Sequence, residues 1–170
     1  MGGQRMARCG CKVLAMAALV IAGPAVAAPL PPALQQAVAR GAHIFNDDSF
    51  GSHVKPVPDA ASAFAALDGA PHGGPRFMTC AACHIHGGLV RGRLPDGRRI
   101  ASLRNAAAVF PRYNVKSHRV MTLEAQIRHC VRDGIVGRAP AYGSSTMVDL
   151  VSYLKSIAAG QRIAIGGPTH

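Results

Sequence analysis

Five consecutive residues, Cys80-Ala81-Ala82-Cys83-His84, constrain this chain more than any other part of its sequence. Two cysteines separated by two residues and followed directly by histidine form the attachment pattern of a covalently bound haem. The spacing suits that chemistry, because two thiols can bond to the vinyl groups on one porphyrin edge while the adjacent imidazole reaches the iron. We therefore predict a fold that encloses one haem c per chain, with Cys80 and Cys83 as attachment points and His84 as an axial ligand.

Two other uses of a Cys-x-x-Cys pair fit the sequence less well. A zinc site would need a second ligand pair at similar spacing, and the chain has no second Cys-x-x-Cys. A redox dithiol of the thioredoxin type would need a preceding strand and a following helix, which the sequence does not suggest. His86 lies two residues beyond His84, and we interpret it as a solvent-facing or hydrogen-bonding side chain.

The first 27 residues have the pattern of a secretory signal peptide. Basic residues precede an apolar run over 13–27 that ends in Ala25-Val26-Ala27, so we place cleavage after Ala27. An uncleaved anchor is the alternative, although the apolar run is shorter than the roughly 20 residues that span a bilayer. Bacteria attach haem to such motifs outside the cytoplasm, so the two signals agree on a periplasmic protein.

Residues 28–170 then form the mature chain, which is long enough for one domain with one core. Loss of Arg5, Arg8 and Lys12 lowers the formal net charge from +11 to +8. Such a basic exported protein suggests an acidic redox partner, an anionic substrate or a membrane surface, although a solvated basic surface without a partner is an alternative. Nucleic acid is not expected as a partner after export.

Apolar periodicity and cap residues predict the helices. The predicted helices cover residues 31–45, 122–134 and 144–160, with a weaker one over 59–69. Thr122 is the expected N-cap of the second helix and Gly134 its end, while Ser144 or Ser145 begins the last helix and Gly160 closes it. No strand of useful length is apparent, and we predict an all-α domain of three to five helices around the haem.

The first and last predicted helices resemble those of cytochrome c domains. The opening helix carries Gly41 and Phe45 in the sequence GAHIF, and the closing helix carries Tyr153 and Leu154 in SYLKSI. The resemblance implies that the two helices cross, and Gly41 would allow the last helix to approach closely.

Cys130 has no partner cysteine in the mature chain, because Cys80 and Cys83 are assigned to the haem. It shares one helix face with Leu123, Ile127 and Val131, and that face would turn toward the haem. A thiolate is a strong iron ligand, so Cys130 is the favoured second axial ligand, although a buried free cysteine is common. Other candidates for the ligand are Met147, Met121, His118 and His129.

The second half of the chain resembles the cytochromes of bacterial sulfur oxidation, namely the SoxA subunit of the thiosulfate-oxidising complex and the thiosulfate dehydrogenases. The matching points are Phe110-Pro111-Arg112-Tyr113, Leu123-Glu124, Ile127, Cys130, Ser145 and Tyr153. The resemblance implies that Cys130 is the axial thiolate. It also implies that this cysteine can leave the iron and bond to substrate sulfur.

Two features depart from that family. Its members carry an arginine one helical turn before the ligand cysteine, where this chain has Gln126, and its dehydrogenases carry a second haem. We therefore expect an electron-carrying monohaem cytochrome, and we keep oxidation or transfer of a thiosulfate-like anion at Cys130 as the alternative. That alternative would use a separate haem subunit, and its anion-binding candidates are Arg112, Lys116 and Arg119.

Overall fold

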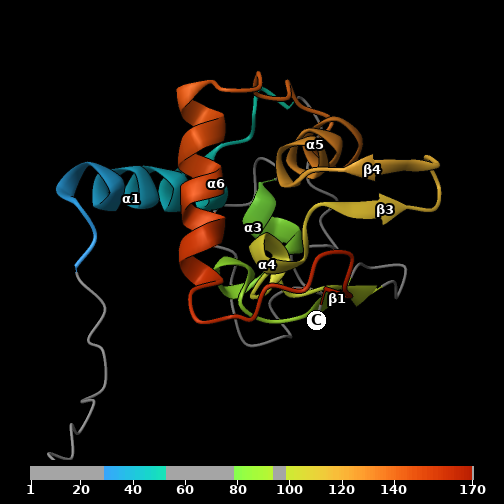
Figure 1. The fold of residues 1–170 in the computed structure, drawn as a ribbon. Helices are drawn as coiled ribbons and strands as arrows, with labels where there is room; N and C mark the ends of the chain where they lie inside the picture. The colour runs from blue at the N-terminus through green and yellow to red at the C-terminus, as the bar shows by residue number, and fades with distance from the viewer. Residues whose placement is uncertain (1–28, 53–78, 94–98, 170) are drawn as a thin grey trace, which may run out of the picture.

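Helices dominate the computed structural model, which describes residues 29–52, 79–93 and 99–169 (Figure 1). The α-helices are α1 (Pro32–Asp47), α3 (Cys80–Cys83), α4 (Ala106–Val109), α5 (Leu123–His129) and α6 (Ser145–Ile157). A 3₁₀ turn, η1 (His86–Gly88), follows α3. The helices predicted over 31–45 and 144–160 are confirmed, with ends close to those observed. The predicted signal peptide and the helix predicted over 59–69 lie outside the described residues.

Two small antiparallel sheets accompany the helices, so the expectation of an all-α domain was incomplete. Strand β1 (Gly92–Arg93) pairs with β2 (Arg99–Ile100), and β3 (Arg112–Asn114) pairs with β4 (Arg119–Met121). Strands of two or three residues are too short to show the alternation of apolar and polar residues that identifies a strand in a sequence. The cytochrome c-like arrangement of helices is otherwise as predicted.

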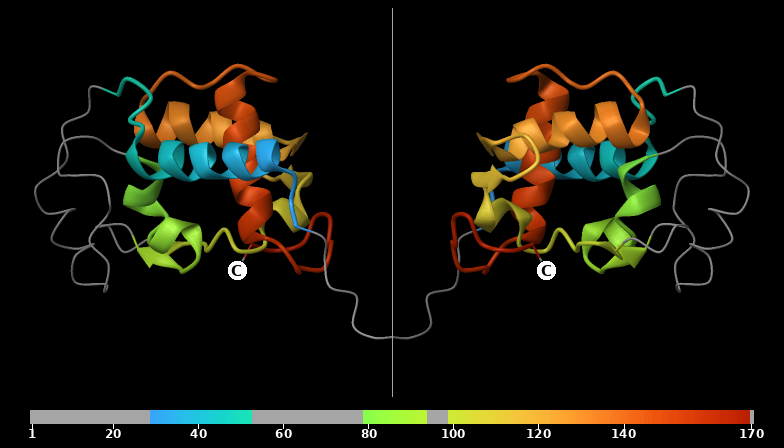
Figure 2. Two further views of the ribbon diagram at one scale, coloured as in Figure 1. Left: turned by 90° about the vertical axis from the view of Figure 1, so that its left-hand side faces the viewer. Right: turned by 90° about the vertical axis from the view of Figure 1, so that its right-hand side faces the viewer.

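The close crossing of α1 and α6 organises the fold, and Figure 2 shows it from two sides. Gly41 lies at the contact, where a Cβ atom would stand 2.0 Å from the main-chain oxygen of Asp149. Two further contacts flank this point. Arg40 forms an ion pair with buried Asp149, at 2.8 Å from Nε to Oδ2, and the rings of Phe45 and Tyr153 lie 5.3 Å apart. The prediction that Gly41 permits a close approach is confirmed.

The predicted helix over 122–134 changes its character halfway. Thr122 is the N-cap, since its hydroxyl accepts a hydrogen bond from the Ala125 amide at 3.2 Å, as expected. From Cys130 the chain continues as a π-helical segment, η2 (Cys130–Ile135). The prediction that Gly134 ends the helix was wrong, because the cap is Val136, whose φ of 58° is left-handed. Segments of π-helix such as η2 often occur at functional sites in proteins.

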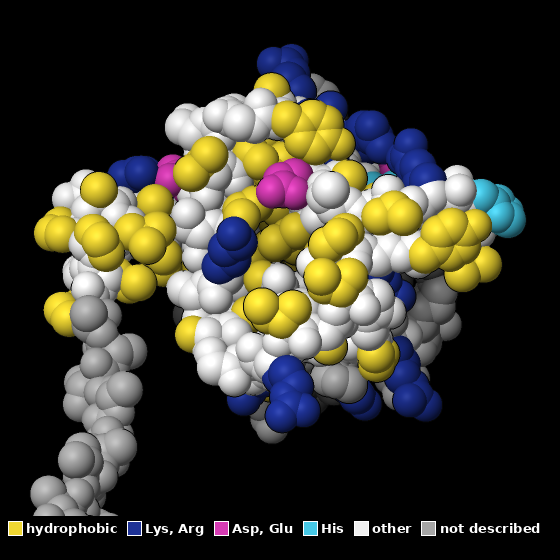
Figure 3. All heavy atoms as spheres, viewed as in Figure 1, with side chains coloured by type: hydrophobic (Ala, Val, Ile, Leu, Met, Phe, Trp, Pro, Cys, Tyr) yellow, Lys and Arg dark blue, Asp and Glu magenta, His cyan; other side chains and the backbone are white. Residues whose placement is uncertain are grey.

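The hydrophobic core lies between α1, α6 and the α5–η2 segment, and it includes Phe45, Ile127, Val131, Leu150 and Leu154. Helix α5 and the C-terminus lie toward opposite ends of the molecule (Figures 1 and 2). Hydrophobic side chains are visible in a recess between α6 and the β3–β4 sheet (Figure 3). Within the described residues, no helix is both long and apolar enough to cross a membrane.

Candidate haem-binding site

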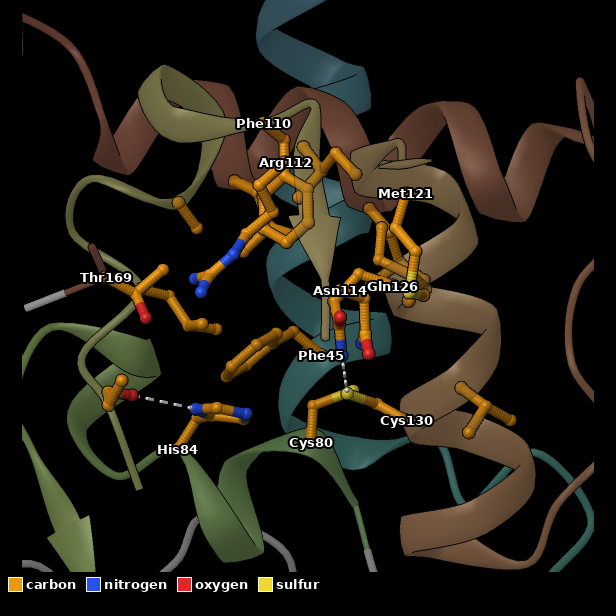
Figure 4. A pocket seen from close by; sticks show the side chains of 18 of the residues that line it. Phe45, Cys80, His84, Phe110, Arg112, Asn114, Met121, Gln126, Cys130 and Thr169 are labelled. Carbon is orange, nitrogen blue, oxygen red and sulfur yellow. Dashed lines mark hydrogen bonds between the residues drawn. The ribbon is translucent and has the colours of Figure 1, made fainter. Parts of the chain in front are cut away.

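A cavity of about 460 Å³ opens between α3, α5 and α6, and its walls are mainly apolar (Figure 4). Three of the residues singled out in the sequence, Cys80, His84 and Cys130, line it together. The predicted helix face also lines it, since Leu123, Ile127 and Val131 contribute to the wall. The fold therefore brings Cys80 and His84 of the attachment motif to one apolar space with the distant Cys130, whereas Cys83 is not among the residues of its wall.

His84 is held in the form that can bind a metal. Its Nδ1 lies 3.3 Å from the carbonyl oxygen of Ala101. A carbonyl can only accept a hydrogen bond, so Nδ1 carries the proton and Nε2 keeps a free lone pair. Burial lowers the pKa of His84, although the bond to Ala101 opposes this effect. The imidazole is therefore neutral at physiological pH.

Cys80 and Cys83 begin and end the single turn of α3. Thr79 caps this turn by accepting a hydrogen bond from the Ala82 amide at 3.3 Å. Both thiols are free, as is Cys130, so the described cysteines form no disulfide. Burial, followed by the neighbouring Cys130 and Cys83, raises the pKa of Cys80 to about 12, and burial likewise raises the pKa of Cys83. Both side chains are protonated thiols at physiological pH.

Cys130 occupies the first position of η2 and accepts a hydrogen bond from the preceding helical turn. The Nε2 of Gln126 donates a hydrogen bond to its Sγ at 3.3 Å. Burial raises the pKa of Cys130, whereas the bond from Gln126 lowers it. A metal that binds this sulfur would displace the proton, because coordination deprotonates a thiol.

The other candidate axial ligands differ in position. Met147 is 1% exposed within the core, His118 is exposed in the turn between β3 and β4, and His129 pairs with Asp133 at 2.6 Å. None of these three lines the cavity. Met121 does line it, and its sulfur lies 3.9 Å from the Ser117 hydroxyl.

The predicted anion-binding residues divide into two groups. Arg112 and Lys116 line the cavity, whereas Arg119 is exposed on β4 outside it. Arg128 lies on α5, directly after Ile127. Its side chain donates a hydrogen bond to the carbonyl oxygen of Pro140, and its guanidinium carbon stacks 4.7 Å from the centroid of the Tyr142 ring. His86 is exposed, in agreement with the sequence interpretation.

Two polar residues of the cavity wall had no signal in the sequence. Asn114 enters from β3, where its Oδ1 accepts from the Ser117 amide at 3.0 Å. Thr169 enters from the C-terminal segment, whose amides at Ala164 and Gly166 donate hydrogen bonds to carbonyl oxygens of α4. A residue so far from the haem motif has no recognisable spacing to it, so sequence reasoning had no means to identify Thr169.

The donor set fits a haem c. Two thiols at the required spacing lie beside a neutral imidazole with a free Nε2, and apolar walls suit a porphyrin. A sulfur donor is available on another element, either Cys130 or Met121. Fold and cavity together define a c-type cytochrome domain.

Comparisons with known proteins identify the kind of cytochrome. The family described as SoxA/TsdA, cytochrome c domain, matches residues 70–163, which is more than half of the chain. A thiosulfate dehydrogenase from Thiomonas intermedia (strain K12) is 30% identical over 153 residues. That match covers 82% of this chain and 44% of the relative, so the chain spans less than half of that protein's length.

A solved structure shows the same fold. Thiosulfate dehydrogenase (TsdBA) from Marichromatium purpuratum, in its "as isolated" form, superimposes with a TM-score of 0.52 at 24% sequence identity. The superposition covers 81% of this chain and 25% of that one. This chain belongs to the SoxA/TsdA family of cytochrome c domains, as the sequence resemblance indicated, and is an electron-transfer haem protein.

Proposed function

We propose that this protein is a periplasmic monohaem electron carrier with His84 and Cys130 as the axial ligands of a haem attached to Cys80 and Cys83. The observation that carries the proposal is the meeting of Cys80, His84 and Cys130 at one apolar cavity. A bound haem c supplies the iron, which accepts and releases one electron. The signal-like segment over 1–27 supports the periplasmic location.

The side chains around the cavity perform the protein's part of this function. Apolar walls exclude water, and the carbonyl of Ala101 fixes the tautomer of His84 so that Nε2 keeps its free lone pair. Cys130 offers a thiolate once its proton is displaced, and a thiolate favours ferric iron, so we expect a low potential. The hydrogen bond from Gln126 moderates this donor strength.

The rim of the cavity suits brief contact with another redox protein. Tyr113 and Val115 line the cavity and are 54% and 73% exposed, respectively, with Lys116 beside them. A small apolar patch next to a cation fits a weak electron-transfer interface, which needs little buried area. The basic composition favours an acidic partner surface.

The alternative is oxidation or transfer of a thiosulfate-like anion at Cys130, with electrons passed to a second haem subunit. It is favoured by the relatives, both of which are named thiosulfate dehydrogenases. Steady reduction of a one-electron acceptor by purified holoprotein and thiosulfate would support this alternative. Lack of turnover, together with rapid electron exchange with an acidic cytochrome, would support the carrier.

Replacing Cys130 by methionine should remove the thiolate signature of the haem. We expect the low-temperature EPR spectrum of oxidised holoprotein to show a low-spin signal with a narrow spread of g values. In Cys130→Met this signal should disappear and the midpoint potential should rise, because a thioether donates less charge than a thiolate.

Met121→Leu is the matched control, because Met121 is the other available sulfur on the cavity wall and the exchange conserves volume. Its spectrum should equal that of the wild type. A spectrum that changes in Met121→Leu but not in Cys130→Met would transfer the ligand role to Met121 and refute thiolate ligation.

Gln126→Leu should lower the midpoint potential while the thiolate EPR signal persists. The substitution removes the amide that donates to Cys130 Sγ at 3.3 Å, so the sulfur would push more charge onto the iron. Potentiometric titration of both holoproteins measures the shift. Gln126→Glu leaves the length of the side chain unchanged but removes the donor when ionised, so its potential should also fall. An unchanged potential in both variants would contradict this role of Gln126.

A further inference from the structure

Two cations lie on the wall of an otherwise apolar cavity without an acidic counterpart. Arg112 is half-buried and directs its guanidinium into the space (Figure 4), and Lys116 lies at the exposed rim. Among the described residues, no aspartate or glutamate lines the cavity and neither cation forms an ion pair. The guanidinium lies 6.0 Å from the Phe110 ring centroid. A cation in apolar surroundings requires an anion or water to compensate its charge.

The position of Arg112 indicates which anion this could be. In Figure 4 its side chain enters from β3, on the side of the cavity away from Cys80. A haem attached at Cys80 and Cys83 has its vinyl-derived edge at those sulfurs. Its two carboxylates belong to the opposite edge of the ring, so they would face the side from which Arg112 enters.

The end of the chain brings a hydroxyl to the wall of the same cavity. The amides of Ala164 and Gly166 donate to the carbonyl oxygens of Ala108 and Val109, each at 2.9 Å. The Nδ2 of Asn105 donates to the Pro168 carbonyl oxygen at 2.9 Å. These bonds bring Thr169 to the cavity wall, which Arg112 also lines (Figure 4). The C-terminal segment thus adds a second polar group at the same end.

We propose that Arg112, with Lys116 and Thr169, forms the binding site for the carboxylates of the haem itself. In the sequence, Arg112 is a candidate to bind a sulfur anion, whereas this proposal assigns it the haem carboxylates as ligands. Guanidinium and carboxylate form paired, charge-assisted hydrogen bonds, and a lysine at the rim adds a second cation. The inference rests on haem attachment in the proposed function and does not depend on Cys130 as a ligand.

The site has an electrostatic consequence that can be measured. Two cations stabilise ionised carboxylates, so they lower the pH at which a haem carboxylate loses its proton. They also favour ferrous over ferric iron, because the ferrous form has one positive charge fewer. The other titratable side chains on the cavity wall are Cys80, His84, Tyr113 and Cys130. In the holoprotein the first two are bound to the haem.

The test compares holoprotein variants by measuring the midpoint potential between pH 5 and pH 9. In Arg112→Met we expect the potential to fall, and we expect the pH at which it declines to move upward. Arg112→Lys should restore most of both properties, because it keeps the charge. Arg119→Met is the matched control, since Arg119 is exposed on the neighbouring strand outside the cavity, and it should leave the pH profile unchanged.

Arg112→Met and wild-type profiles that coincide would overturn the proposal. A second result would also overturn it. If Arg112→Met keeps the wild-type pH profile of the midpoint potential but loses an effect of thiosulfate on the EPR spectrum, Arg112 binds a substrate anion instead. Lys116→Met provides a second variant if Arg112→Met yields too little holoprotein, and its profile should shift in the same direction. Failure of thiolate ligation is detected separately, in the EPR spectrum of Cys130→Met.

Discussion

A Gly41→Ala variant should be markedly less stable than the wild-type protein, although alanine is the better helix former. The added Cβ would stand 2.0 Å from the main-chain oxygen and 2.6 Å from the carbonyl carbon of Asp149, and 2.8 Å from the Cβ of Tyr153. These atoms belong to the backbone or root of α6 and cannot rotate away, so α1 and α6 must separate. Overpacking that moves backbone atoms lowers the free energy of unfolding by about 3 kcal/mol, the upper end of the usual range, or by more.

The higher helix propensity of alanine would by itself raise the free energy of unfolding by about 1 kcal/mol. The net loss in the free energy of unfolding is therefore roughly 2 kcal/mol. Thermal and denaturant unfolding of the holoprotein, followed by circular dichroism, measures it. Gly134→Ala is the control, because nothing lies within 4 Å of a Cβ at that position and its φ is not positive. A Gly41→Ala variant as stable as Gly134→Ala would refute the close crossing.

The double variant Cys80→Ser/Cys83→Ser should lose its covalent haem completely and with it the cooperative fold. Without haem, the cavity of about 460 Å³ must fill with water or collapse. At about 24 cal/mol per Å³, an empty space of that size would cost at most about 11 kcal/mol. That bound is comparable to the whole stability of a small domain, roughly 5–15 kcal/mol. We therefore expect weak near-ultraviolet circular dichroism and no sharp thermal transition.

Haem staining after denaturing electrophoresis measures covalent attachment, and calorimetry measures cooperativity. Cys130→Ser is the matched control, because it removes the third described cysteine but leaves both attachment thiols. It should retain haem under denaturing conditions and unfold cooperatively. Covalent haem in the double variant would show that attachment does not use the Cys80-x-x-Cys83 pair. Loss of covalent haem in Cys130→Ser would show that attachment also needs Cys130.

The local features of this protein were accessible from its sequence because their signals lie close together along the chain. The haem motif occupies five residues, so its chemistry could be interpreted without a fold. The cap residue Thr122 and the face shared by Leu123, Ile127 and Cys130 follow from helical spacing. Gly41 stood out in an otherwise periodic helix, and the structure supplies the backbone atoms that require it.

The choice among distant side chains needed the tertiary structure. Met147 and Met121 were both chemically competent in the sequence, but only Met121 reaches the cavity, because α6 directs Met147 into the core. Likewise, Arg112 and Arg119 are similar residues on paired strands, and only Arg112 faces the space. The strands themselves were missed, because pairs of two or three residues form through contacts with the rest of the fold rather than through their own pattern.

The sequence by itself determined that the chain carries a haem attachment motif, a helical frame and a family resemblance. All three depend on short-range spacing. Only the tertiary structure decided that Cys130, Arg112 and Thr169 share one cavity with that motif. Cys130 comes from η2 and Arg112 from β3, and hydrogen bonds to α4 hold the C-terminal segment that carries Thr169. Contacts between residues so far apart in the chain leave no periodic signal, since they are set by how the helices pack.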